Sequence, residues 1–143
     1  MGGSENIPTE EGNLNPTGRR EIKELVRGGK DLIKKCPNPQ QIEFDAISIG
    51  VEGLTVVSVL DKESNSLTIS YEILPDGGVI QCRHDPRNPG EIIGRTRLKN
   101  LVAAGVITTY GPPEQRQTED GEERTIEPIK RCELVLVPKD LLQ

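Results

Sequence analysis

The stretch LTISYEILPDGGVIQCRH, residues 67–84, decides how this chain folds. In its first half, apolar residues alternate with polar ones, and this spacing of two is typical of a strand with one buried face. The sequence PDGG at residues 75–78 predicts a tight turn, because proline presets φ and glycine allows a positive φ. Residues 79–84 then return as a second strand. Together with the apolar residues 54–60, this stretch predicts an antiparallel meander.

Before this meander, the alternation of apolar residues changes phase. Ile42, Phe44 and Ala46 follow one phase of a strand, whereas Ile47, Ile49 and Val51 follow the other. A change of phase inside a strand predicts a bulge or a bend. After the meander, further strands are predicted at residues 106–110 and 125–137, on either side of a long polar loop.

Two helices are predicted from apolar spacings of three, four and seven. The first covers residues 17–35 and carries the stripe Ile22, Leu25, Val26, Leu32 and Ile33. The adjacent glycines at 28 and 29 are costly inside a helix, so either the helix breaks there or the pair permits a close crossing. The second helix begins at a capping Thr96 and ends at Gly105.

These elements predict an α+β fold: a mainly antiparallel sheet of five to seven strands, packed against two helices. Residues 17–143 are expected to form a single domain, since a chain of 143 residues is of one-domain size. Residues 1–16 are rich in Gly, Asn, Glu and Pro and are expected to be a disordered tail. The core must rely on aliphatic residues, because Phe44, Tyr71 and Tyr110 are the only aromatic ones.

The composition indicates an intracellular, cytoplasmic protein without a membrane span. No apolar run approaches the ~18 residues that cross a bilayer, and the N-terminal residues show no signal sequence. The three cysteines, Cys36, Cys82 and Cys132, are odd in number and far apart. This arrangement fits small buried residues in a reducing compartment better than a disulfide framework.

Charge alternates along the chain although the net charge is only −5. Residues 19–35 hold seven bases and three acids, a net of +4, and residues 83–99 hold five bases and two acids, a net of +3. Residues 36–82 between them hold one base and seven acids, a net of −6. Either the basic segments lie beside acidic ones and are neutralised internally, or they form a patch for an anionic partner.

No catalytic, cofactor-binding or metal-binding residue is predicted, and no small-molecule substrate is evident. Cys82 and His84 lie on one face of a predicted strand, but alternate strand residues are roughly 6–7 Å apart, too far for a direct hydrogen bond. A Cys82/His84 enzyme remains a third, weaker hypothesis. A zinc site built from Cys36, Cys82, His84 and Cys132 would lack the paired cysteine spacing of such sites.

One stretch resembles a known family. A helix over residues 96–105, then a strand, a polar hairpin and a returning strand, resembles the second half of a winged-helix domain. The resemblance implies nucleic-acid binding, with residues 114–124 as the wing and a basic recognition helix. With the basic residues near the N-terminus, the nucleic-acid contacts would be Arg19, Arg20, Lys23, Arg95, Arg97 and Lys99.

The sequence therefore leaves two functions from different classes. The first is a non-catalytic protein-interaction or assembly module, whose self-association would use an exposed strand edge or an apolar helix face. The alternative is a nucleic-acid-binding regulator with a winged-helix-like C-terminal half. Affinity that falls steeply as salt rises would identify the nucleic-acid binder. Mass that depends on protein concentration would identify the assembly module.

Overall fold

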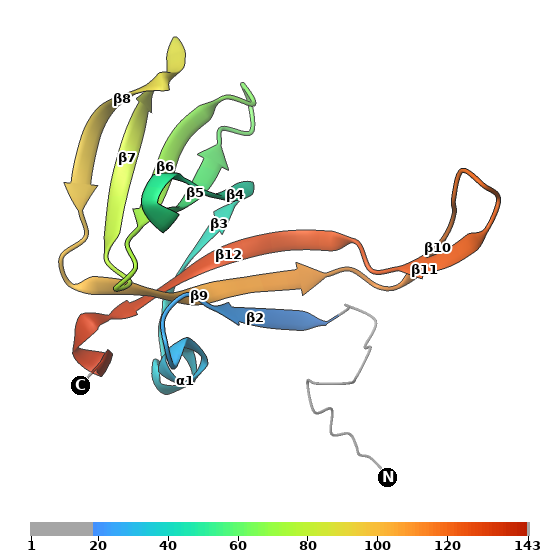
Figure 1. Cartoon of the computed structure of the whole chain (residues 1–143), viewed down its shortest axis with the longest axis horizontal. Helices are drawn as coiled ribbons and strands as arrows, with labels where there is room; N and C mark the ends of the chain where they lie inside the picture. The colour runs from blue at the N-terminus through green and yellow to red at the C-terminus, as the bar shows by residue number, and fades with distance from the viewer. Residues whose placement is uncertain (1–18, 143) are drawn as a thin grey trace. The chain divides into compact units, whose positions relative to one another are not determined.

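The computed structural model describes residues 19–142 of the chain (Figure 1). Strands account for 58% of these residues and helical turns for 11%. The predicted α+β class with two helices is therefore wrong, because the described residues form three antiparallel sheets and a single α-helix. The predicted tail, residues 1–16, lies outside the described residues, and one domain over residues 17–143 stays a prediction.

The described residues group into two compact units. The smaller unit consists of residues 19–21 and 108–131, and the larger unit of residues 22–107 and 132–142. Two long strands, β9 (Leu101–Tyr110) and β12 (Ile129–Pro138), contribute residues to both units.

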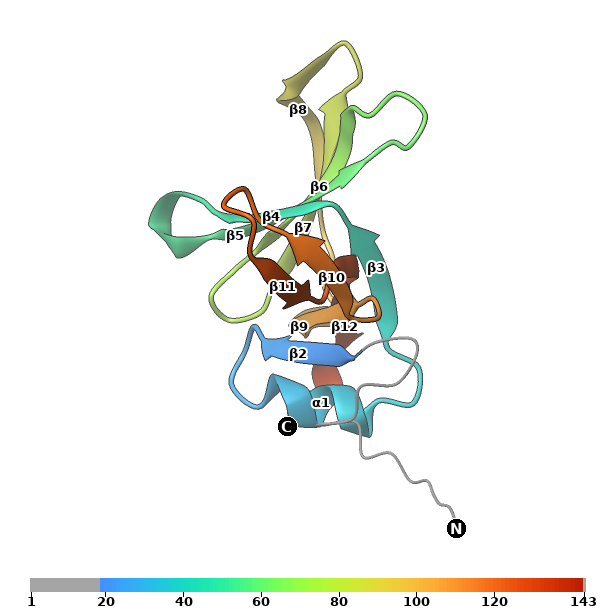
Figure 2. The ribbon, with the colours of Figure 1, turned by 90° about the vertical axis from the view of Figure 1, so that its right-hand side faces the viewer.

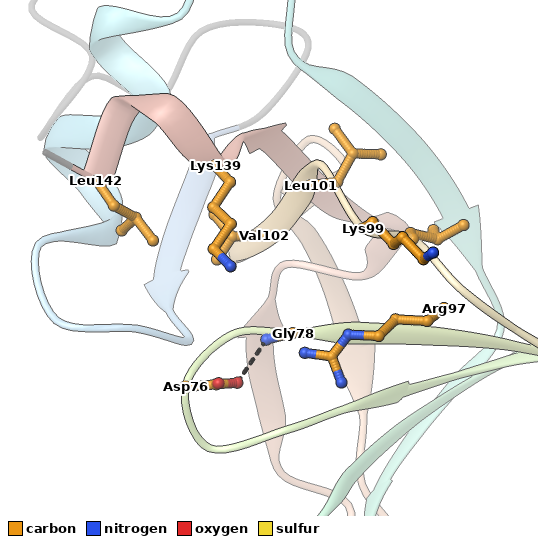
Figure 3. Close-up of a pocket in the computed structure, with 9 residues that line it drawn as sticks. Asp76, Gly78, Arg97, Lys99, Leu101, Val102, Lys139 and Leu142 are labelled. Atoms are coloured by element: carbon orange, nitrogen blue, oxygen red, sulfur yellow. Dashed lines mark hydrogen bonds between the residues drawn. The ribbon is translucent and has the colours of Figure 1, made fainter.

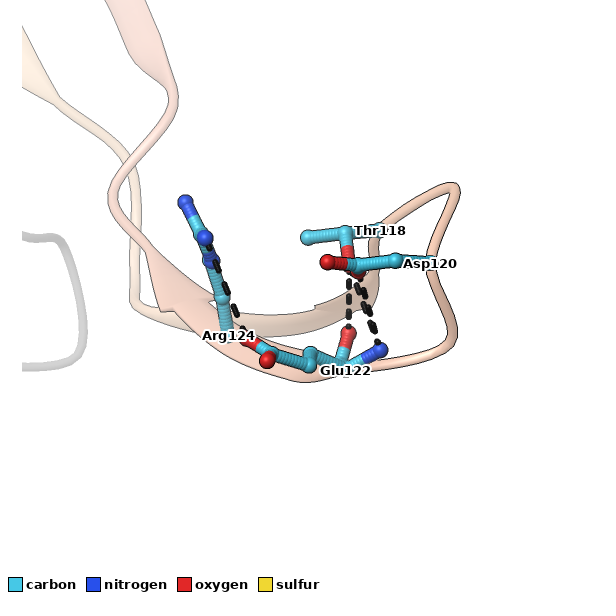
Figure 4. A network of polar contacts seen from close by, with 4 residues as sticks. All are labelled: Thr118, Asp120, Glu122 and Arg124. Atoms are coloured by element: carbon cyan, nitrogen blue, oxygen red, sulfur yellow. Dashed lines mark hydrogen bonds and ion pairs between the residues drawn. The ribbon is translucent and has the colours of Figure 1, made fainter.

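The smaller unit carries a polar hairpin where the sequence predicts a long loop. Its strand β10 (Glu114–Gln117) pairs antiparallel with β11 (Glu123–Ile126). At the turn, the Thr118 hydroxyl donates to the Asp120 carboxylate, which also accepts the amide of Glu122 (Figure 4). These hydrogen bonds hold the pKa of Asp120 below its ordinary value, and the bond from Thr118 has the largest effect. Gly121 completes the turn with a φ of 87°.

Five antiparallel strands form the first sheet of the larger unit, in the order β4-β5-β6-β7-β8. Their bounds are β4 Ala46–Ile49, β5 Thr55–Leu60, β6 Leu67–Ile73, β7 Val79–Asp85 and β8 Asn88–Arg97. The predicted meander over residues 54–84 is confirmed by the pairing of β5, β6 and β7. At its second turn, the amide of Leu74 donates to the carbonyl of Gly78 at 2.8 Å, as the PDGG sequence predicts.

The second sheet has the strand order β2-β9-β12-β3. Its outer strands are β2 (Arg20–Glu24) and β3 (Gln40–Phe44). The helix α1 (Gly29–Lys35) connects these two strands in sequence. Two 3-10 turns complete the described chain, η1 (Val51–Gly53) after β4 and η2 (Lys139–Leu142) after β12.

The core of the larger unit lies on both faces of the four-stranded sheet. Residues Leu134–Val137 of β12 are all fully buried. Leu134 and Leu136 pack with apolar residues of β5, β6 and β7, whereas Val135 and Val137 pack with residues of α1. Alternate residues of a strand point to opposite faces, so β12 is covered by the five-stranded sheet on one side and by α1 on the other (Figures 1 and 2).

The bend that the phase change between Ala46 and Ile47 predicts is present nearby, as a corner between the sheets at Asp45. Phe44 ends β3 in one sheet and Ala46 begins β4 in the other, with Asp45 alone between them. The amide of Asp45 donates to the carbonyl of Ser58 at 2.9 Å, and its carboxylate accepts the amide of Leu60 at 2.7 Å. Asp45 therefore fixes the bend with its backbone and its side chain.

The predicted helix over residues 17–35 is wrong in its first half, because residues 20–24 form strand β2. Strand β2 ends at Glu24, and Gly28, with a φ of 76°, is the residue before the helix, which begins at Gly29. The second glycine of the pair, Gly29, is required for a different reason. A Cβ atom at this position would lie 2.0 Å from the carbonyl oxygen of Ala104 in β9. The break and the close crossing that the sequence suggested are thus both present.

The second predicted helix, residues 96–105, is also wrong. Residues 96 and 97 end strand β8, and β9 begins at Leu101. Leu and Ala favour a helix, but residues 102–107 are buried, and burial on both faces of a sheet overrides local propensity. The winged-helix resemblance loses its recognition helix, and its wing is the hairpin β10–β11.

Substitution of Gly29 by alanine tests the close crossing. The new Cβ would overlap the backbone of β9, which cannot move without breaking the sheet, so Gly29→Ala should lower the free energy of unfolding by at least about 2 kcal/mol. Urea titration followed by circular dichroism measures this loss. Gly50→Ala is the control, because its φ is −89° and its nearest atom would be 3.5 Å away. Equal stability of both variants would contradict the crossing.

Candidate functional site

His84 and Ser70 form a buried hydrogen-bonded pair. The Ser70 hydroxyl lies 2.7 Å from His84 Nε2, and His84 Nδ1 lies 2.8 Å from the carbonyl oxygen of Pro89. Since a carbonyl only accepts, Nδ1 carries the proton and Nε2 accepts from the serine. This geometry resembles a nucleophile and its base. However, Ser70 is only 3% exposed, so a substrate has no path to its oxygen, and the pair is best explained as a satisfied polar contact.

Cys82 is held as a neutral thiol beside this pair. It is fully buried, and this burial, assisted by the nearby Glu72 carboxylate, raises the pKa of the thiol above its ordinary value. Hydrogen bonds with Arg95 and Ser70 act in the opposite direction with less effect. A nucleophilic cysteine needs the thiolate, so this environment disfavours the Cys82/His84 enzyme hypothesis.

The candidate metal ligands are spread over separate elements. Cys82 and His84 lie on β7, whereas Cys36 follows α1 and Cys132 lies on β12. Between residues 19 and 142, no group of three or more His, Cys, Asp or Glu side chains is placed to hold a metal ion. In the same range, no helix is long and apolar enough to cross a membrane.

Two of the predicted nucleic-acid contacts are already engaged by acidic residues. The Arg19 guanidinium bonds Glu127 at 2.8 Å and lies 4.1 Å over the ring of Tyr110. The hydrogen bond with Glu127 raises the pKa of Arg19 above its ordinary value. Arg95 pairs with Glu72 at 3.4 Å. For these two residues, the structure favours internal neutralisation over a patch for phosphates.

The other four predicted contacts divide into two pairs. Arg20 and Lys23 are exposed on β2, with Arg20 in the smaller unit and Lys23 in the larger. Arg97 ends β8 and Lys99 lies in the turn before β9, and both line one small pocket of about 30 Å³. Lys139 of η2 lines the same pocket (Figure 3). Lys139 could not be predicted from the sequence as a neighbour of Lys99, because 40 residues separate the two.

The sequence predicts an exposed strand edge without locating it, and the structure has such an edge at β4 of the five-stranded sheet. All four residues of this strand, Ala46–Ile49, are exposed, and the side chain of Ile49 is 77% exposed. The strand contains no charge and no proline. By contrast, the edge strands β2, β3 and β8 all carry charged residues, and β8 also has Pro89 and an irregular register. Sheet edges without such protection are available for pairing with another strand.

The raised pKa of Cys82 predicts that its thiol reacts slowly with alkylating reagents. At neutral pH, iodoacetamide should modify Cys82 in the native protein far more slowly than in the unfolded chain, because both exposure and thiolate are lacking. Peptide mapping by mass spectrometry over time measures the rate at each cysteine. Cys132, which is partly exposed, is the internal comparison. Modification of native Cys82 at the unfolded rate would show that the site is open and the thiol activated.

Comparison with protein-family models, with curated proteins and with solved structures gives no match to this chain. Its function must therefore be argued from the geometry. The described residues offer two surfaces for this purpose: the unprotected edge at β4 and the pocket lined by Arg97, Lys99 and Lys139.

Proposed function

We propose that this protein is a non-catalytic self-assembly module, in which β4 of one copy pairs with β4 of a second copy. The observation that supports this proposal is the unprotected edge of the five-stranded sheet. An uncharged, exposed edge strand is a liability unless it has a partner. None of the three cysteines forms a disulfide within the described residues, which fits an intracellular setting for such a module.

The backbone of β4 presents its free hydrogen-bonding groups at two isoleucines. The amide of Gly50 donates to the carbonyl of Leu54 at 2.6 Å, which places this pair in the ladder between β4 and β5. Hydrogen-bonded pairs alternate along antiparallel strands, so Ser48 faces β5 as well. The N–H and C=O groups of Ile47 and Ile49 therefore point outward from the sheet edge.

This edge is complementary to itself in one antiparallel register. If Ile47 of one copy lies opposite Ile49 of the other, the symmetric register contains two such isoleucine pairs. Each pair exchanges two backbone hydrogen bonds, which gives four bonds in total. In the same register Ser48 lies opposite its own copy, and Asp45 lies opposite Val51. No two like charges are directly opposite, so the pairing joins apolar side chains without a local electrostatic penalty.

The size of the contact predicts weak association. A pair of four-residue strands buries much less than the roughly 1,200 Å² of a stable interface, so a dissociation constant of about 0.1–1 mM is expected. Salt should strengthen the association. Residues 36–82, which include β4, have a net charge of −6, and two copies repel each other until this charge is screened.

The test is the molar mass in solution from about 20 µM to about 1 mM protein, a range that brackets the expected constant. Multi-angle light scattering of the full chain should show a mass rising from one copy toward two. Ile49→Lys should abolish this rise, because it adds a charge to the pairing edge. Ile93→Lys is the matched control, since Ile93 is 52% exposed on the opposite edge strand β8.

Two outcomes would contradict the proposal. One is a wild-type mass that stays at a single copy over the whole range at both low and high salt. The other is equal loss of association in both variants. The salt dependence also separates the proposal from nucleic-acid binding, which stays a prediction, because affinity for an oligonucleotide should fall as salt rises.

A further inference from the structure

One pocket lies between η2, the turn from β6 to β7 and the turn from β8 to β9. The side chains that line it carry an excess of positive charge. Arg97, Lys99 and Lys139 line it, together with a single carboxylate, Asp76. None of these three cations forms an ion pair within the described residues. The pocket therefore has a net charge of +2, and Leu98, Leu101, Val102 and Leu142 supply its apolar wall.

Backbone hydrogen bonds hold together the segments that carry these cations. The amide of Lys139 donates to the carbonyl of Asn100 at 2.8 Å, and the amide of Leu98 donates to the carbonyl of Val79 at 2.9 Å. The turn that carries Lys99 is thus fixed between η2 and β7. Like charges repel each other, so three cations on neighbouring segments are stabilised when an anion enters between them.

Asp76 offsets only one of the three positive charges. One oxygen of its carboxylate accepts the amide of Gly78 at 2.9 Å within the turn between β6 and β7. Figure 3 shows Asp76 on one side of Gly78 and the Arg97 guanidinium on the other. A side chain at Gly78 would lie 3.0 Å from that guanidinium, so the glycine leaves room for Arg97 over the turn.

The geometry points to a binding site for a phosphate monoester at this pocket. A volume of about 30 Å³ has room for about two water-sized groups, so two oxygens of a tetrahedral phosphate can enter while its ester oxygen stays outside. The planar guanidinium of Arg97 can donate to two such oxygens at once. A monoester carries a charge of about −2 at neutral pH, which matches the +2 of the pocket.

The same observations favour a monoester over a nucleic-acid backbone. A backbone carries one charge per phosphate in a row, and its binding requires a line of free cations. Arg95, two residues before Arg97 on β8, is instead paired with Glu72. Arg97, Lys99 and Lys139 thus form a compact group and do not continue a line of unpaired cations along β8.

The test is titration of the full, ¹⁵N-labelled chain with inorganic phosphate, followed by amide chemical shifts at constant ionic strength set with sodium chloride. Gly78, Lys99 and Lys139 should shift together and saturate, with a dissociation constant of about 1–10 mM for such an exposed site. Arg97→Gln and Lys139→Gln should each weaken binding about three- to tenfold. Arg87→Gln is the control, because Arg87 is exposed, lies outside the pocket and has no ion pair within the described residues.

A second arm uses a short single-stranded oligonucleotide, and a third uses a phosphoserine peptide. The monoester site is supported if the chemical shifts saturate with phosphate and with the peptide. Binding should then be weaker in Arg97→Gln and Lys139→Gln but unchanged in Arg87→Gln. Shifts that rise linearly without saturation overturn it, as does equal weakening in Arg87→Gln. Tighter binding of the oligonucleotide than of the phosphoserine peptide, with the same dependence on Arg97, also overturns it and assigns the pocket to nucleic acid.

Discussion

Burial of β12 on both of its faces is the constraint on which the larger unit depends. Residues Leu134–Val137 are fully excluded from water, and their alternation divides the core between two layers. A chain with only three aromatic residues must bury many small aliphatic ones instead. A central strand that is covered twice gives each residue its full burial, at roughly 1.5–3 kcal/mol for a Val or Leu side chain.

The positions of Gly29 and Asp45 follow from this layering. α1 can cover the outer face of β9 only if its first turn approaches the backbone of Ala104, which a side chain at Gly29 would prevent. Asp45 turns the chain from one sheet into the other between Phe44 and Ala46. The β4 edge that begins after this corner is therefore a product of the same packing: β4 has β5 on one side and no neighbouring strand on its other side within the described sheets.

The features that could be predicted from the sequence are those that depend on residues close together in the chain. Strict alternation gave the bounds of β6, the PDGG sequence gave the turn after it, and the phase change before Ile47 gave the corner. Residues 96–105 could not be assigned in this way, because Leu and Ala fit a helix and only burial from both sides selects a strand. The pocket was equally hidden: Arg97 and Lys99 are close in sequence, but Lys139 joins them through the pairing of distant strands.

The pairing of β3 with β12 has a consequence for the order of folding. Phe44 lies opposite Cys132, and Ile42 lies opposite Leu134, so these contacts join residues about ninety positions apart. The meander of β5, β6 and β7 needs only short loops and can assemble early, whereas closing such long loops is entropically slow. During synthesis, the part of the meander that packs against Leu134 and Leu136 therefore stays uncovered until β12 has left the ribosome. In that interval the growing chain exposes aliphatic side chains of the meander, and transiently exposed apolar surface is prone to aggregate.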